Sequence, residues 1–267
     1  MELLKLLKFP LNKAAPFSSA FKGNIQNKPQ SSHHAALKLD EIRAIYQKQP
    51  KTQMNLFRNF EEIPHLSLNL LEQMNRHGIA NPTEIQMSMF GHFFQGSPDD
   101  ILIKSQPGSG KSLGYVIMLL ADFFKKARIG GAIFSSRADG IKCKYLIIVP
   151  SDLLARQIDS WLRELSQNSA KTALLCETFE QLQNGPDCDF LIATPESFRI
   201  KLAQGSINVK GIECVVLDEA DALVKPLKRF ASPKQKEMRI KHPVTTMLLL
   251  SEILKAIASN KLLNRPR

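Results

Sequence analysis

The stretch ILIKSQPGSGKSLGYVIMLLADFF, Ile101–Phe124, decides the fold of this chain. It opens with a short apolar run, Ile101–Ile103, that predicts a buried strand, and it continues into a glycine-rich turn. From Lys111 to Phe124 the apolar residues recur at helical spacing. A strand, a glycine-rich turn and a helix in this order are typical of a loop that binds phosphate.

The turn has the residues that such a loop requires. Gly108 and Gly110 have no Cβ, so the backbone between them can curl around phosphate oxygens. The helix N-terminus adds a partial positive charge, and Lys111 adds a full one. The Ser112 hydroxyl is placed to ligate Mg²⁺. The strict pattern has glycine where this chain has Ser105, and a turn that only caps a helix is the alternative.

Further apolar runs predict more strands, with helices between them. The predicted strands are Tyr145–Val149, Thr172–Leu175, Phe190–Ala193 and Cys214–Leu217. The predicted helical segments are Leu153–Leu165, a turn at Glu180–Gln183, and Thr245–Ala258, and Arg128–Lys142 reads as a loop. Strands that are apolar throughout and alternate with helices predict an α/β fold with a mostly parallel sheet covered on both faces.

An acidic motif follows the last of these strands, in CVVLDEAD at Cys214–Asp221. Ligands bind outside the carboxyl ends of the strands in an open parallel sheet, so Asp218 and Glu219 should face the phosphate loop. We expect Asp218 to hold Mg²⁺ through its water shell and Glu219 to orient and deprotonate the attacking water. Helix N-capping is the alternative, and it explains one acid better than the pair.

The order of these motifs resembles the DEAD-box RNA helicases from about Phe60 to Asp221. The resemblance implies a RecA-like P-loop domain over residues 54–267, incomplete at its C-terminal end. DEAD at Asp218–Asp221 matches the motif that names the family. The phosphate loop is similar to the family's, and the resemblance implies nucleotide contact along the whole turn: Ser105, Gln106, Pro107, Gly108, Ser109, Gly110, Lys111 and Ser112.

The segment FEEIPHLSLNLLEQMNRHGIANPTEIQ, which starts at Phe60, resembles the family's adenine-recognition segment. The resemblance implies that Gln86 hydrogen-bonds the adenine edge and that Phe60 packs against the base. Pro82 and Thr83 would shape the turn that presents Gln86. Apart from the resemblance, the leucines of this segment predict the core face of a helix.

Two further motifs resemble the family's RNA-facing segments. PSDLLARQ at Pro150–Gln157 is similar to PTRELAxQ, and ATPES at Ala193–Ser197 is similar to TPGR. The residues that we expect to contact RNA are Pro150, Ser151, Arg156, Thr194, Pro195 and Arg199. Their contacts would include backbone N–H groups as well as side chains.

This RNA-facing set departs from the family while the nucleotide-facing set is nearly intact. Asp152 and Leu153 stand where the family has Arg and Glu, and Ser197 stands where TPGR has Arg. A carboxylate at Asp152 would repel phosphate at close range. We therefore expect Arg156 and Arg199 to compensate.

The chain also ends earlier than the family pattern. After Asp221 the family continues to a Ser-Ala-Thr motif and a second RecA-like domain that supplies arginine fingers, and neither occurs before Arg267. A truncated product, an alternative form and a partial gene model all fit. Because arginine fingers contribute on the order of 10³–10⁵ in rate, we expect these residues alone to bind ATP but hydrolyse it slowly.

Composition agrees with a polyanion partner. The formal net charge is +11, which favours nucleic acid, although a charged soluble surface is the alternative. The four cysteines form no CxxC pair, so we expect them to be reduced and structural. A basic stretch at Lys225–Lys241 reads either as a solvated loop or as an RNA site. No apolar run is long enough to span a bilayer, and we expect a monomer.

The N-terminal residues differ in composition from the rest. From Met1 to Leu39 the only acid is Glu2, against six lysines, and the segment opens with the amphipathic MELLKLLKF. We read residues 1–53 as a basic extension that is either a mitochondrial transit peptide or a disordered tail. The absence of arginine before Leu39 weighs against a transit peptide. If it is not one, a nuclear or cytoplasmic protein is expected.

Together these observations predict an ATP-dependent RNA helicase with ATP and Mg²⁺ as cofactors. Its partners would be single-stranded or short duplex RNA and, if mitochondrial, ribonucleoprotein or ribosome-assembly factors. The alternative is a non-catalytic, one-domain remnant that binds nucleotide or RNA. A small-molecule kinase on a P-loop scaffold explains neither Gln86 nor the DEAD sequence.

Overall fold

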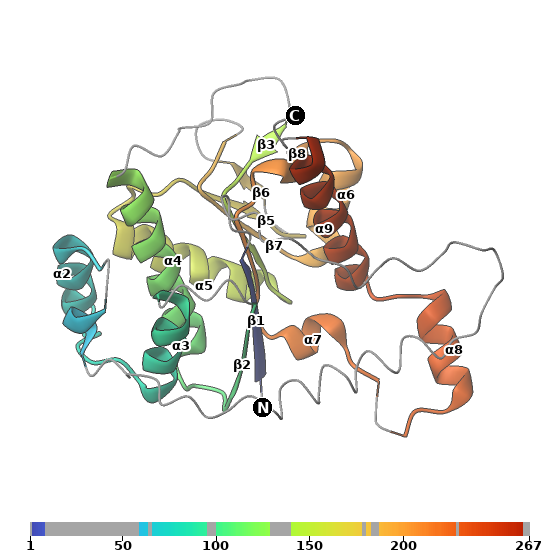
Figure 1. The fold of residues 1–267 in the computed structure, drawn as a ribbon, viewed down its shortest axis with the longest axis horizontal. Coiled ribbons are helices and arrows are strands. Elements are labelled where there is room, and N and C mark those ends of the chain that lie inside the picture. The colour runs from blue at the N-terminus through green and yellow to red at the C-terminus, as the bar shows by residue number, and fades with distance from the viewer. Residues whose placement is uncertain are drawn as a thin grey trace. The chain divides into compact units, whose positions relative to one another are not determined.

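A seven-stranded sheet in the order β2-β1-β9-β4-β7-β5-β6 forms the centre of the computed structural model (Figure 1). The structure describes residues 2–8, 59–63, 66–94, 100–128, 140–177, 180–182, 187–227 and 230–263. The strands of this sheet are β1 (Glu2–Lys8), β2 (Ile101–Ser105), β4 (Tyr145–Ile148), β5 (Thr172–Leu175), β6 (Glu180–Leu182), β7 (Phe190–Ala193) and β9 (Cys214–Leu217). A separate pair joins β3 (Ile141–Lys142) to β8 (Ile207–Asn208).

The parallel centre of the sheet confirms the predicted α/β fold. β4 pairs in parallel with β7 and β9, and β5 pairs in parallel with β7. All four of these strands are buried along their whole length. Such burial on both faces explains why they read as continuous apolar runs rather than alternating ones.

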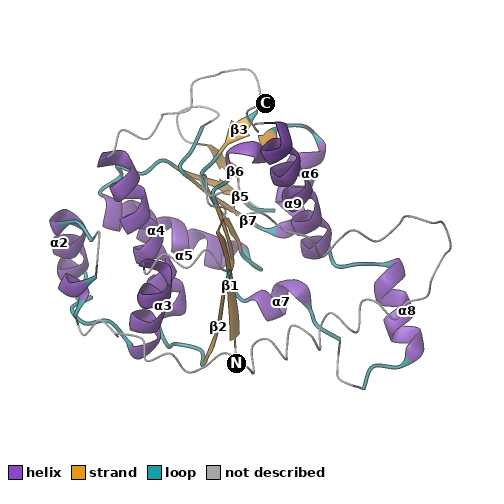
Figure 2. Cartoon of the chain, in the orientation of Figure 1, coloured by secondary structure: helices purple, strands orange, loops and turns teal. Residues whose placement is uncertain are grey.

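Helices cover both faces of the sheet (Figures 1 and 2). One side has η1 (Phe60–Glu62), α2 (Leu68–Arg76), α3 (Glu84–Phe94), α4 (Lys111–Arg128) and α5 (Asp152–Ser166). The other has α6 (Pro195–Ala203), η2 (Val209–Gly211), α7 (Ala220–Val224) and α9 (Thr245–Leu263), while α8 is Pro233–Lys241. Alternate side chains of β4 serve the two cores: Tyr145 and Ile147 pack with α2–α5, and Leu146 and Ile148 pack with α6 and α9.

The strand β1 differs from the expectation that residues 1–53 are an extension outside the domain. It lies between β2 and β9 and runs antiparallel to both, with Glu2 opposite Ser105 and Lys8 opposite Cys214. Its pairing joins β2 to the rest of the sheet, because β1 is the strand that β2 pairs with in the described part of the chain. The remainder of the predicted extension, from residue 9, lies outside the described residues.

Three local predictions need correction. The predicted helical turn at Glu180–Gln183 is wrong, because Glu180–Leu182 forms a strand that pairs antiparallel with the outer edge of β5. The loop predicted at Arg128–Lys142 ends in β3, while residues 129–139 lie outside the described part. The basic stretch is not loop throughout, because Ser232 and Gln235 form a reciprocal cap that starts α8.

The other predicted elements are confirmed, with small shifts at their ends. Ser151 caps α5 by accepting a hydrogen bond from the Leu154 N–H, so the helix begins at Asp152 rather than Leu153. The last helix extends to Leu263. In the described residues, no helix combines the length and the apolarity that crossing a bilayer requires.

Candidate nucleotide-binding site and RNA-facing edge

The sheet brings the predicted motifs to one edge, because its parallel strands end on the same side. The glycine-rich turn follows β2, and Asp218 follows β9. Pro150 follows β4 after one residue, and Thr194 follows β7 directly. In register, Ile148 lies between Leu217 and Ala193, so the β9, β4 and β7 motifs are neighbours in that order. This convergence is what the parallel topology predicts.

The glycine-rich turn has the backbone of a phosphate cradle. Gly108 and Gly110 have φ of +74° and +90°, a region that residues with a Cβ rarely adopt. A Cβ on Gly110 would lie 2.8 Å from the Gln86 Nε2 atom, whereas one on Gly108 would meet nothing within 4 Å. Gly110 is therefore required by close packing, and Gly108 borders open space that a phosphate can enter.

Lys111 is hydrogen-bonded to residues of the glycine-rich turn that precedes it. Its side chain is buried, and its Nζ donates to the Gln106 carbonyl oxygen at 2.8 Å and, at 3.4 Å, to the Ser105 carbonyl oxygen and the Ser109 hydroxyl. The Ser105 and Ser109 hydroxyls are 2.6 Å apart and hydrogen-bonded. Ser105, the departure from the strict pattern, thus closes the loop. Phosphate oxygens are charged acceptors, so they can replace these neutral partners of the ammonium group.

Gln86 links α3 to this loop. Its side chain is 2% exposed. Its Oε1 accepts from the Thr83 N–H at 2.9 Å, and its Nε2 donates to the Gly110 carbonyl at 2.9 Å. The Thr83 hydroxyl adds a hydrogen bond to the Ser109 carbonyl at 2.9 Å. Each end of the amide makes one of these hydrogen bonds and has the capacity for a second, and the role of Gln86 in binding adenine stays a prediction.

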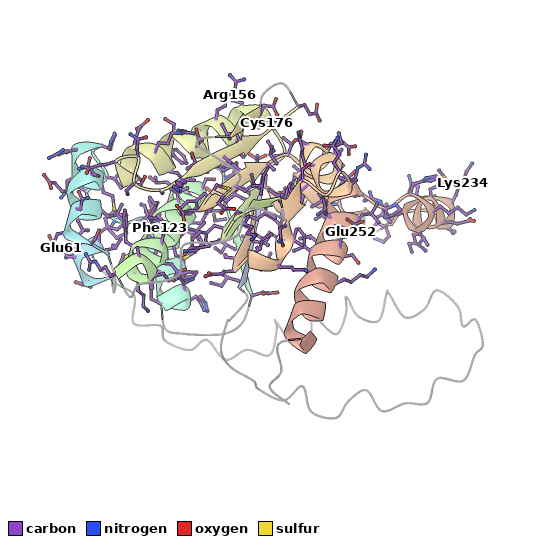
Figure 3. All side chains as sticks on the ribbon, turned by 90° about the horizontal axis from the view of Figure 1, so that it is seen from above. Glu61, Phe123, Arg156, Cys176, Lys234 and Glu252 are labelled. Atoms are coloured by element: carbon purple, nitrogen blue, oxygen red, sulfur yellow. The ribbon has the colours of Figure 1, made fainter. Side chains whose placement is uncertain are left out.

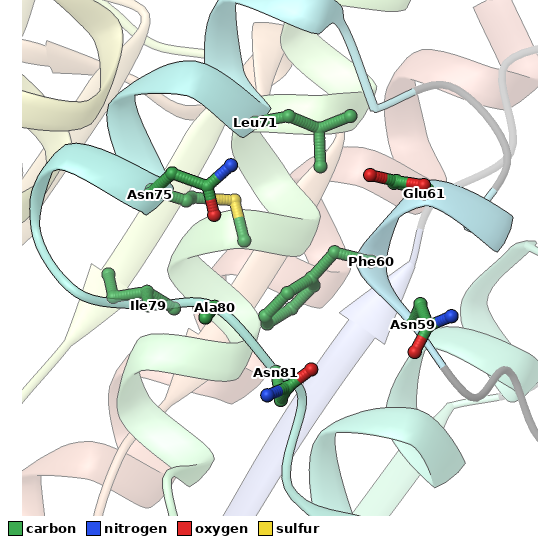
Figure 4. A pocket seen from close by; sticks show the side chains of 9 residues that line it. Asn59, Phe60, Glu61, Leu71, Asn75, Ile79, Ala80 and Asn81 are labelled. Carbon is green, nitrogen blue, oxygen red and sulfur yellow. The ribbon is translucent and has the colours of Figure 1, made fainter.

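Phe60 lines a hollow of about 140 Å³ beside α2 (Figure 4). Its ring is buried and packs edge-to-face on Phe90, with 6.1 Å between ring centroids. The lining residues are Asn59, Phe60, Glu61, Leu71, Met74, Asn75, Ile79, Ala80 and Asn81. This volume is below the range of about 300–1,000 Å³ that is usual for small-molecule pockets, and contact of Phe60 with adenine stays a prediction.

The acidic motif is anchored by a residue that the sequence analysis did not single out. Asp218 is 1% exposed, and its Oδ2 accepts a hydrogen bond of 3.0 Å from the Tyr115 hydroxyl. Its Oδ1 accepts from the Glu219 N–H at 2.9 Å. Burial, with the Asp218 charge and hydrogen bond, raises the pKa of Tyr115 well above its usual value, so the hydroxyl keeps its proton. The one sequence signal for Tyr115 was its place four residues after Lys111.

Glu219 has an unusual backbone for its residue type. Its φ is +48°, in the left-handed region, and it immediately precedes α7. Conformations of this kind in residues with a Cβ cost about 1–3 kcal/mol and cluster at functional sites. No group of three or more His, Cys, Asp or Glu side chains in the described residues could hold a metal alone.

The β4 motif carries mixed charge at the edge that is predicted to face RNA. Asp152 hydrogen-bonds Cys176 at the end of β5, and Arg156 lies close enough to affect the same thiol (Figure 3). Burial first, and then the Asp152 charge, raises the pKa of Cys176 to about 12. Pro150 is half-buried, while Ser151 and Arg156 are exposed. Of this motif, Arg156 is the cation that is accessible to a phosphate.

The β7 motif is less accessible than expected. Thr194 is 4% exposed, and its hydroxyl donates to the Ser197 hydroxyl at 3.1 Å. Pro195 begins α6. Arg199 is exposed, but its guanidinium donates twice to Glu196, which lowers the pKa of that carboxyl. The structure thus places the predicted residues at one edge, but Thr194 is buried and the Arg199 charge is paired.

Comparison with known proteins identifies the family. The model of the DEAD/DEAH box helicase family matches residues 83–251, which include Gln86, the glycine-rich turn and the acidic motif. This chain belongs to the DEAD/DEAH box helicases. The match confirms the resemblance that the motifs indicated. It also confirms the predicted RecA-like fold class and membership of an ATPase family.

Individual relatives are longer than this chain. ATP-dependent RNA helicase DBP6 of Vanderwaltozyma polyspora is 33% identical over 133 residues, which cover 47% of this chain and 19% of that protein. ATP-dependent RNA helicase p62 of Drosophila melanogaster is 27% identical over 218 residues, which cover 79% of this chain and 28% of that protein. A structure of S. cerevisiae Dbp5 bound to RNA and ADP BeF3 aligns with a TM-score of 0.48 at 17% identity, over 70% of this chain and 44% of that one. The chain spans under a third of the two curated relatives.

Proposed function

We propose that this chain is the first motor domain of an ATP-dependent RNA helicase, which binds ATP and Mg²⁺ and couples hydrolysis to RNA strand separation or remodelling. One observation carries the proposal: the phosphate loop with Lys111 and the carboxylates of Asp218 and Glu219 follow strands that end at the same edge of one sheet. Membership of the DEAD/DEAH box helicases supports it.

The residues present suit ATP and Mg²⁺. Residues Ser105–Ser112 would hold the phosphates, because the loop has an open side at Gly108 and a buried ammonium at Lys111. Ser112 and Asp218 would hold Mg²⁺, which when bound neutralises charge on the phosphate oxygens. Glu219 would orient and deprotonate the attacking water. Phe60 and Gln86 would bind the adenine.

RNA would cross the neighbouring edge, over the motifs that follow β4 and β7. Exposed Ser151 and Arg156 provide a donor and a cation there, and the backbone N–H groups of Glu196 and Ser197 lie in the first turn of α6. The relatives' printed names call them RNA helicases, which supports RNA as the partner. We propose a monomer that acts with ribonucleoprotein or ribosome-assembly partners.

A non-catalytic module is the second candidate, and the RNA-facing edge favours it. Asp152 contributes negative charge, Arg199 is paired with Glu196, and Thr194 is buried. These three positions would therefore attract an RNA phosphate less strongly than the family's residues, while the residues of the nucleotide loop are intact. A module of this kind would bind nucleotide, and RNA would not stimulate ATP hydrolysis.

An ATPase assay with and without single-stranded RNA separates the two candidates. Stimulation by RNA, even at a low rate, supports the helicase, and nucleotide binding without stimulation supports the module. Lys111→Ala should abolish nucleotide binding, whereas Glu219→Gln should retain ATP and block hydrolysis. If Lys111→Ala binds a fluorescent ATP analogue as the unmodified chain does, the assignment of the loop is wrong.

Mitochondrial localisation is a separate proposal. It is supported by the lysine-rich, acid-poor composition of residues 1–39, and one relative is named DEAD-box ATP-dependent RNA helicase 47, mitochondrial, of Arabidopsis thaliana. Removal of a leader would also remove β1 from the sheet. Residues 1–53 fused to a fluorescent protein test the proposal: import supports it, and a diffuse or nuclear signal contradicts it.

A further inference from the structure

Tyr115 connects the two halves of the candidate ATP site. It lies one helical turn after Lys111 in α4, and its hydroxyl reaches the Oδ2 atom of Asp218 at 3.0 Å. The two residues are 103 positions apart in the chain. In the sheet, β1 separates β2 from β9, so this hydrogen bond crosses from the helix of the phosphate loop to the end of a strand that β2 does not contact.

The hydrogen bond fixes a carboxylate that has little other freedom. Tyr115 is 0% exposed and Asp218 is 1% exposed, so bulk water does not compete for the Oδ2 atom. The Glu219 N–H holds the Oδ1 atom at 2.9 Å. A carboxylate oxygen has two lone pairs, and each oxygen can accept one of these bonds and still bind a further donor or a metal-bound water.

We propose that Tyr115 is a positioning residue, which orients the Asp218 carboxylate so that Mg²⁺ binds in a fixed relation to the phosphate loop. The inference rests on the proposed function, because it assigns a role within the same ATP site. Groups that orient metal ligands commonly change metal affinity by about 10–100-fold when they are removed. Tyr115 does not contact the reacting atoms and acts through Asp218.

The chain provides a matched control in Tyr145. This tyrosine is also 0% exposed, and its hydroxyl also donates to an aspartate Oδ2 atom, that of Asp122, at 2.7 Å. Asp122 belongs to an ion-pair cluster with Lys126 and Glu213 instead of the acidic motif. Tyr145→Phe therefore removes the same chemical group from an equally buried tyrosine, at a hydrogen bond whose acceptor is less buried.

The experiment measures binding of a fluorescent ADP analogue to the full chain while Mg²⁺ is titrated. Tyr115→Phe should raise the half-saturating Mg²⁺ concentration about 10–100-fold and leave metal-free nucleotide affinity unchanged. Tyr145→Phe should leave both within twofold. If the two variants have the same Mg²⁺ dependence, Tyr115 has only a structural role and the inference is overturned. If the unmodified chain binds no nucleotide at any Mg²⁺ concentration, the proposed function itself fails.

A second measurement does not depend on the folding of Tyr115→Phe. The chain has three tyrosines, Tyr46, Tyr115 and Tyr145, so ¹³Cζ-tyrosine labelling gives three resonances. Tyr46→Phe and Tyr145→Phe assign two of them and leave Tyr115 as the third. Adding Mg²⁺ to the nucleotide-bound chain should shift the Tyr115 resonance and not that of Tyr145. An unmoved Tyr115 resonance would overturn the inference.

Discussion

Two buried glutamines offer a test of what holds the glycine-rich turn to α3. Gln86 in α3 is 2% exposed and satisfies both the Thr83 N–H and the Gly110 carbonyl. Gln73 in α2 is 6% exposed, and its Nε2 atom is buried without a hydrogen-bond partner among the described residues. Substituting each with methionine keeps the side-chain length and removes the amide. The unfolding free energy should therefore fall in Gln86→Met and stay the same or rise in Gln73→Met.

The magnitudes follow from the hydrogen bonds. Gln86→Met leaves one donor and one acceptor without partners in a partly buried setting, at about 1 kcal/mol each, which predicts a loss of about 2 kcal/mol in unfolding free energy. Gln73→Met removes an unsatisfied donor and should be neutral or stabilising by about 1 kcal/mol. At roughly 2–4 °C per kcal/mol, a gap of about 2–3 kcal/mol separates the melting temperatures by about 4–12 °C.

Guanidinium denaturation of both variants, with the slope checked against the unmodified chain, measures this difference. Fluorescent ATP binding should weaken in Gln86→Met, because the loop loses its link to α3, and should be unchanged in Gln73→Met. Equal destabilisation of the two variants would refute the reasoning, since it would mean that the Gln86 hydrogen bonds contribute no more than an unpaired amide.

Three further predictions concern the RNA-facing edge and its buried thiol. Arg156→Ala combined with Arg199→Ala should lower single-strand RNA affinity and flatten its salt dependence; unchanged binding would remove the compensation hypothesis. Asp152→Arg should raise RNA affinity at low salt, measured by fluorescence anisotropy, because it replaces a repulsive charge with an attractive one. Burial and Asp152 raise the pKa of Cys176 to about 12. Because the folded state holds the thiol proton more tightly than the unfolded state, whose pKa is about 8.5, this group stabilises the fold fully below about pH 8.5. That contribution is lost as the pH rises from about 8.5 towards 12. Denaturation at about pH 10 should therefore show a smaller alkaline loss in Cys176→Ala than in the unmodified chain.

Local chemistry explains which features the sequence was sufficient to predict. The strand, turn and helix around Gly108 and Lys111 depend on residues that are neighbours in the chain. The β4, β5, β7 and β9 strands are buried on both faces, so their apolar runs located them to within a residue. The convergence of motifs at one edge followed from the parallel sheet alone.

Elements whose stability depends on a distant partner were predicted less well. Glu180–Leu182 has no apolar pattern of its own and forms a strand because the edge of β5 is available to pair. The Glu2–Lys8 segment resembles a targeting sequence locally, yet its backbone pairs with β2 and β9, about a hundred and two hundred residues away. Composition near an end of the chain does not reveal such a partner.

The sequence by itself therefore determined the glycine-rich turn, the acidic pair, the α/β class and the family, since each depends on residue types at short, fixed spacing. The tertiary structure alone decided that Gln86 binds the loop backbone and that Tyr115 holds Asp218. These contacts join residues 24 and 103 positions apart. They exist because sheet order and helix packing bring α3, α4 and β9 together, which no local pattern of residues encodes.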